Sequence, residues 1–95
     1  MERFQVAHIR EQGQDLVIVV VNTSVHHKSD SEKAEILATL QRASISAGLA
    51  GTAVLAWESN GILNVYCNFA FHAFFRSITY EAVLASINKT LSVAA

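Results

Sequence analysis

The sequence predicts an α+β fold in which a strand-strand-helix unit occurs twice, in the order ββαββα. Three observations predict it: an unbroken aliphatic run over 16–21, an Asn60-Gly61 turn between two apolar runs, and a helical segment after each strand pair. The halves cover 3–48 and 52–92 of a single domain, 1–95. We expect a two-layer sandwich, with a four-stranded, mainly antiparallel sheet and both helices on one of its faces.

The first half begins with two strands, over 4–9 and 15–22, joined by a turn at 11–14. The second strand contains six consecutive aliphatic residues, Leu16 to Val21, and four of them are valine. Branching at Cβ suits a pleated surface, and an unbroken run indicates a strand that is covered on both faces. Ser29 and Glu32 have the spacing of a capping box, which predicts the start of a helix that ends at Gly48. Its apolar stripe consists of Ile36, Leu37, Leu40, Ala43 and Ala47.

The second half contains a hairpin with strands over 52–58 and 62–68. Asn60-Gly61 is a strong hairpin signal because both turn residues must accept a positive φ. A two-residue turn fixes the register, and it pairs Ser59 with Ile62, Trp57 with Asn64, Leu55 with Tyr66, and Ala53 with Asn68. The other side of the hairpin, beneath the helices, carries Val54, Ala56, Leu63, Val65 and Cys67. We predict a closing helix from Ser77 or Thr79, with an apolar stripe of Tyr80, Val83, Leu84, Ile87 and Leu91.

The two halves can be superimposed at an offset of 46 residues. The matched residues are Val19, Asn22, His26 and Ser31 in the first half and Val65, Asn68, His72 and Ser77 in the second. The identities are few, and two amphipathic helices always share apolar spacing. True duplication and convergence on one pattern therefore both remain open.

The composition excludes several classes of function. Only 16% of the residues are charged, whereas 52% are hydrophobic, and this balance favours an oligomer over a free monomer. The net charge is −1 and the basic residues are scattered, so binding to a nucleic-acid backbone or to a membrane surface is not expected. The longest aliphatic stretch is far shorter than a membrane span, and a single cysteine fits a reducing compartment. We expect a cytoplasmic protein.

The sheet face away from the helices is the first candidate site. It would present a mixture of aromatic, aliphatic and amide side chains: Leu55, Trp57, Ile62, Asn64, Tyr66 and Asn68. An exposed patch of this kind usually marks an interface. We expect two chains to pack sheet to sheet or to join edge to edge, or the face to bind a small apolar ligand. The alternative is that loops or the aromatic segment fold over it.

An aromatic segment follows this strand and contains Phe69, Phe71, His72, Phe74 and Phe75. It could form the wall of a small-molecule pocket or a plug against a neighbouring subunit. Packing in a core or an interface is the favoured interpretation, because aromatic side chains dominate buried area without any ligand.

The remaining polar candidates are Asn22, His26 and His27, which match Asn68 and His72 in the second half. Imidazole is a common metal ligand and base. However, the predicted strand directions place the ends of the second and fourth strands at opposite edges, about 20 Å apart for seven-residue strands. One ion could not bind both His26 and His72 of a single chain. We therefore predict no metal site, no cofactor and no catalytic residue, and Cys67 is expected to be a packing residue.

Three function classes follow. The favoured one is a homo-oligomeric interaction or small-molecule-binding module that uses the aromatic sheet face. The first alternative is a small oligomeric enzyme with a histidine acid or base at a subunit boundary, where His26, His27 and His72 are the candidates. The second is a weak binder of single-stranded nucleic acid that stacks bases on Trp57 and Tyr66, which the charge balance disfavours.

Overall fold

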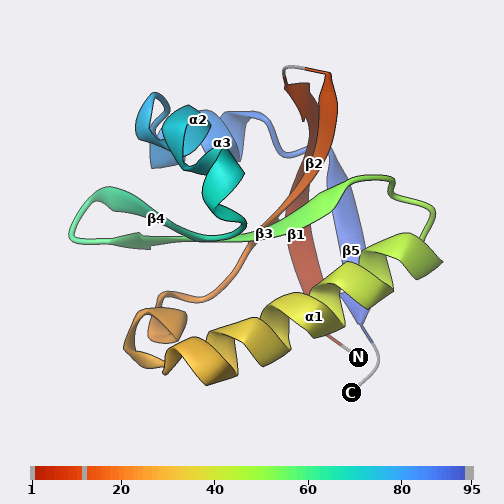
Figure 1. The fold of residues 1–95 in the computed structure, drawn as a ribbon, viewed down its shortest axis with the longest axis horizontal. Coiled ribbons are helices and arrows are strands. Elements are labelled where there is room, and N and C mark those ends of the chain that lie inside the picture. The colour runs from red at the N-terminus through yellow and green to blue at the C-terminus, as the bar shows by residue number, and fades with distance from the viewer. Residues whose placement is uncertain (1, 12, 94–95) are drawn as a thin grey trace.

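The fold is α+β, as predicted, and its sheet is mixed. The computed structural model describes residues 2–11 and 13–93, with the backbone alone at Phe69, and within them five strands follow the order β4-β3-β2-β1-β5 (Figure 1). β2 and β3 are parallel, and the other neighbouring pairs are antiparallel. The strands are β1 (Glu2–Glu11), β2 (Gln14–Val20), β3 (Thr52–Ser59), β4 (Ile62–Tyr66) and β5 (Lys89–Val93).

Helix α1 (Asp30–Ser46) connects the two parallel strands in the centre of the sheet. It begins with the predicted capping box, because Glu32 N–H donates to the Ser29 hydroxyl at 3.1 Å while Ser29 N–H donates to the Glu32 carboxylate at 3.2 Å. It ends before Gly48, whose φ of 80° is the predicted left-handed stop. At Gly51, φ is 127° and an added Cβ would lie 2.5 Å from the carbonyl oxygen of Asp15. The return into β3 therefore requires glycine there.

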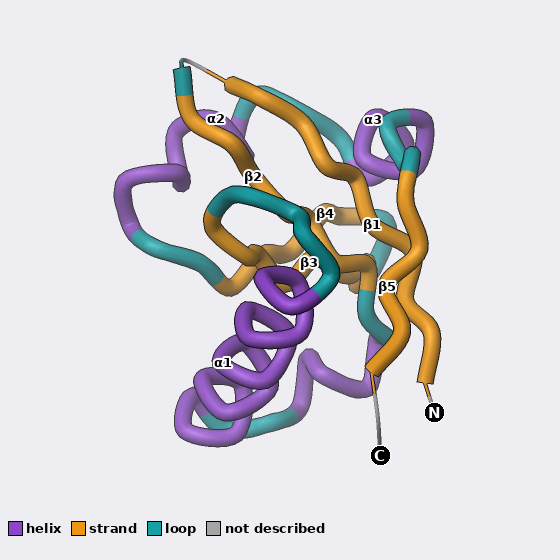
Figure 2. The backbone as a smooth tube through the Cα atoms, turned by 90° about the vertical axis from the view of Figure 1, so that its right-hand side faces the viewer, coloured by secondary structure: helices purple, strands orange, loops and turns teal. Residues whose placement is uncertain are grey.

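The helices lie on opposite faces of the sheet, so the prediction of two helices on one face is wrong. α1 covers the face that carries Leu55 and Trp57, whereas the short helices α2 (His72–Arg76) and α3 (Tyr80–Ala85) cover the opposite face (Figure 2). Consecutive residues of β2, Leu16 to Val19, and of β3, Ala53 to Trp57, are buried. The central strands are covered on both sides, which their aliphatic composition favours.

The predicted closing helix is also wrong beyond its first turns. α3 begins after its Thr79 cap, as predicted, but it ends at Ala85, and the chain then forms β5 along the outer side of β1. Asn88 makes this turn, since its side chain accepts from His8 N–H at 2.8 Å and donates to His8 C=O at 2.9 Å. Leu91 is 1% exposed and packs beneath α1. The predicted number of four strands is therefore wrong, because β5 is a fifth strand and covers an edge of β1 that a four-stranded sheet would leave unpaired.

The two halves are alike in part. Both contain a strand pair followed by a 3₁₀ helix, η1 (Thr23–His27) and η2 (Phe69–Phe71), and then an α-helix. The second half differs because its helical segment is divided into α2 and α3, and because β5 has no counterpart in the first half. None of the described helices is long and apolar enough to cross a membrane.

Candidate functional site: the outer edge of β4

The predicted aromatic face is not an open surface. Leu55 is 0% exposed and Trp57 is 3% exposed, because α1 packs over both. Tyr66 is half-buried, and its hydroxyl donates to the Asp30 carbonyl at the start of α1 at 3.4 Å. Of the remaining members, Ile62 and Asn68 are exposed and Asn64 is half-buried. The prediction of an uncovered face is wrong, and Ile62 and Asn64 instead lie on the strand at the edge of the sheet.

His26 packs against the polar end of the buried Trp57. The indole N–H donates to His26 Nδ1 at 3.2 Å, so the imidazole accepts this bond with Nδ1 unprotonated. His27 meets His26 edge to face at 5.4 Å, and Lys33 Nζ lies 5.4 Å from the centre of the indole ring. His26 and Lys33 thus close over the tryptophan, and its ring is not an open stacking platform.

The two matched asparagines perform the same local task. The Asn22 side chain accepts from Ser24 N–H at 2.8 Å, and the Asn68 side chain accepts from Ala70 N–H at 2.9 Å. Each therefore caps the 3₁₀ helix that follows its strand. This capping gives Asn22 and Asn68 the same local structural role.

The aromatic segment forms η2 and α2. Phe75 is 5% exposed and belongs to the core under α2 and α3, with Phe71 and Phe74 packed against it. The rings of Phe74 and Phe75 meet at 5.0 Å. Phe69 lies in η2, and its side chain lies outside the described residues. Phe75 therefore packs in the core of the described residues.

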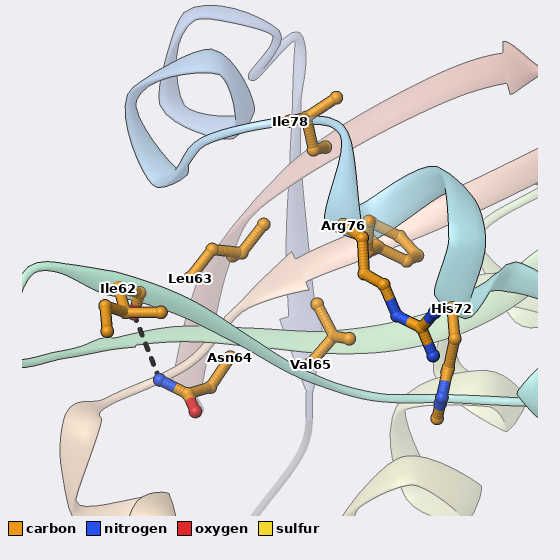
Figure 3. Close-up of a pocket in the computed structure, with 8 residues that line it drawn as sticks. Ile62, Leu63, Asn64, Val65, His72, Arg76 and Ile78 are labelled. Carbon is orange, nitrogen blue, oxygen red and sulfur yellow. Dashed lines mark hydrogen bonds between the residues drawn. The ribbon is translucent and has the colours of Figure 1, made fainter.

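A groove of about 420 Å³ runs between β4 and α2. His72 and Arg76 extend from α2 towards β4 beside Val65, and Leu63 lies further along the same strand (Figure 3). Its lining consists of five apolar residues and three polar ones: Ile62, Leu63, Asn64, Val65, His72, Phe75, Arg76 and Ile78. Leu63 and Val65 place the groove on the α2 side of the sheet, and Ile62 and Asn64 border it at the outer edge of β4.

The outer edge of β4 has a regular backbone pattern. Asn60 and Gly61 have φ of 54° and 76°, and Ser59, Trp57 and Leu55 pair with Ile62, Asn64 and Tyr66 as predicted; β4 ends before the predicted Ala53–Asn68 pair. In a two-residue hairpin these facing residues exchange the hydrogen bonds, so the N–H and C=O groups of Leu63 and Val65 point away from β3. The Asn64 side chain donates to the Ile62 carbonyl at 3.0 Å. Two residues of β4 thus offer backbone groups to a further strand.

Cys67 lies at the end of this edge, beside a smaller groove of about 270 Å³ that Val65, Tyr66 and His72 also line. Burial raises the pKa of its thiol to about 11. The thiol is therefore protonated near neutral pH and is a poor nucleophile. Nowhere in residues 2–11 and 13–93 do three His, Cys, Asp or Glu side chains gather to hold a metal ion.

Sequence reasoning missed four residues of the groove. It assigned Leu63 and Val65 to a covered face, and it gave no role to Arg76 or Ile78. The signal that could have found the edge is the composition of Ile62–Tyr66, which has no charge and no proline. Comparison of the chain with known protein families, with curated proteins and with solved structures gives no match.

Proposed function

We propose that this protein is a homo-oligomeric interaction module and that two copies join through the outer edges of β4. One observation carries the proposal: β4 is an end strand with a free, uncharged edge. Ile62 on this strand is 65% exposed. Proteins that remain monomeric usually protect such an edge with lysine, proline, a bulge or a covering element.

The sequence of β4 is complementary to itself in an antiparallel pairing centred on Asn64. Leu63 would then exchange backbone hydrogen bonds with Val65 of the second chain, and Val65 with Leu63 of the second chain. Ile62 would face Tyr66 of the second chain, while the two Asn64 amides meet at the two-fold axis. Each apolar side chain would have an apolar partner, and no charge would be buried.

The opposite edge of the sheet is less suited to pairing. β5 carries Lys89, and its Thr90 and Ser92 are exposed as well. A lysine on an end strand opposes addition of another strand because its charge would be desolvated. Glu2 at the start of β1 pairs with Val93 at the end of β5 on this side of the sheet (Figure 1). We therefore assign the contact to β4.

Light scattering with matched lysine variants tests this proposal. We expect the wild type to have about twice the chain mass of 10.3 kDa at high concentration. Ile62→Lys should return it to the monomer, because two lysines would enter the seam. Ile45→Lys is the matched control, since Ile45 is also 65% exposed but lies on α1. A wild type that stays at 10.3 kDa, or equal dissociation of the dimer by both variants, would contradict the proposal.

A further inference from the structure

We infer that the groove between β4 and α2 binds a small amphipathic carboxylate, with its apolar chain along β4 and its carboxylate on Arg76. This inference rests on the proposed dimer, because the strand of the second chain would close the open side of the groove.

The lining suits a short hydrocarbon chain. Leu63 and Val65 form the floor on the α2 side of the sheet, and Ile78 lies across from them (Figure 3). Phe75, which is buried in the core under α2, completes the apolar lining. The volume of about 420 Å³ lies within the range of about 300–1,000 Å³ that is typical of ligand pockets. Such pockets are mainly apolar and hold a few polar groups that orient the ligand. The groove has this composition.

The charge in the groove is positive and unpaired. Arg76 is exposed, and within the described residues no carboxylate or hydrogen-bond acceptor engages its guanidinium. No aspartate or glutamate lines the groove, and the imidazole of His72 lies beside the guanidinium of Arg76 (Figure 3). A guanidinium presents paired N–H donors that match a carboxylate in a bidentate geometry. An anionic headgroup is therefore the complementary ligand.

The proposed dimer would strengthen this site. A two-fold axis perpendicular to a continuous sheet keeps the α2 helices of both chains on the same side, so each groove would face its copy across the seam. The β4 strand of the second chain would then occupy the side on which the groove opens to solvent. Excluding water from the carboxylate and Arg76 lowers the local dielectric and strengthens their attraction.

Calorimetric titration with octanoate tests the inference, with light scattering on the same samples. We expect the wild-type dimer to bind one octanoate per chain and Arg76→Gln to remain dimeric but to bind at least tenfold more weakly. Arg42→Gln, which removes an exposed arginine on α1, should bind as the wild type does. Octanamide has the same hydrocarbon chain without the charge. It should bind the wild type and Arg76→Gln with the same affinity, which should be lower than the affinity of the wild type for octanoate.

The outcomes separate this inference from the proposed function. If the wild-type dimer does not bind octanoate, or if Arg76→Gln binds it as tightly, the proposal of a carboxylate ligand is wrong and the proposal of a dimer still stands. A wild-type monomer would overturn the proposed function and the closing role of the second chain. Weaker binding of octanoate to the wild type at concentrations where light scattering shows the monomer would support the closure of the groove by the partner strand.

Discussion

Replacing Gln41 with alanine should destabilise the protein strongly, because this side chain joins α1 to the start of β3. Its amide oxygen accepts from Ala53 N–H at 2.8 Å, and its amide nitrogen donates to the Gly51 carbonyl at 3.0 Å. Gln41 thus holds the backbone on both sides of the first residue of β3. Ala53 is 1% exposed, so its N–H depends on this partner.

The expected magnitude follows from the two bonds. Leaving a buried N–H unsatisfied costs roughly 1–3 kcal/mol, and the second bond contributes about 1 kcal/mol. Water can enter a groove of about 300 Å³ that Gln41 and Ala53 both line, which favours the lower part of this range. We expect a loss of about 2 kcal/mol in the free energy of unfolding. For a domain of this size that lowers the Tm by roughly 8–16 °C.

Urea unfolding at one fixed protein concentration measures this loss, since self-association would otherwise shift the apparent stability. Gln14→Ala is the matched control, because Gln14 is exposed beside the first hairpin turn. It should change the free energy of unfolding by less than about 0.5 kcal/mol. A Gln41→Ala protein that unfolds within about 0.5 kcal/mol of the wild type would refute the reasoning.

Three further predictions concern local features. Gly51→Ala should lower the free energy of unfolding by about 3 kcal/mol or more, because its added Cβ would meet the Asp15 backbone. Gly48→Ala should lower it by only about 1–2 kcal/mol, because its φ is 80° but no atom lies near the added Cβ. Equal urea midpoints for the two variants would contradict this prediction. The backbone and side-chain hydrogen bonds of Ser29 lower the pKa of Glu32 below its ordinary 4.5, so Ser29→Ala should raise it in an NMR titration. A depressed carboxyl pKa stabilises the fold above the unfolded value and ceases to do so as the pH falls through the folded value. Because burial raises the pKa of Cys67 to about 11 from 9.0, iodoacetamide should react roughly 100-fold more slowly at pH 8 than with an ordinary thiol; equal rates would refute its burial.

The local features of the fold could be predicted because a few residues determine each of them. Asn60-Gly61 fixes the register of its hairpin, and Ser29 with Glu32 fixes the start of α1. The position of Leu91 could not be predicted in this way. The spacing of Leu91 from Leu84 and Ile87 suits a helix, but its alternation with polar residues suits a strand equally well. The segment forms a strand because it pairs with β1, a contact between residues far apart in the sequence.

The placement of the helices is a consequence of strand direction. Because β2 and β3 are parallel, the second hairpin runs opposite to the first while its strands keep the same order across the sheet. The two hairpins are therefore related by a half-turn about an axis that lies in the plane of the sheet, perpendicular to the strands. Such a rotation reverses the strand directions, keeps the strand order and exchanges the two faces of the sheet. A repeated unit therefore places its second helix on the opposite face. The face that carries Trp57 was predicted to be open, but α1 covers it because the two helices lie on opposite faces.

Disulfide trapping across the seam tests the β4 pairing most directly. In a Cys67→Ala background, Asn64→Cys would place two thiols at the two-fold axis, where facing Cα atoms lie about 4.5 Å apart, within disulfide reach. Ile62→Cys is the control, because Ile62 would lie about 13 Å from its copy along the strand. We predict that mild oxidation links Asn64→Cys into a covalent dimer and leaves Ile62→Cys monomeric. No linkage at Asn64, or equal linkage at both positions, would contradict assembly through β4.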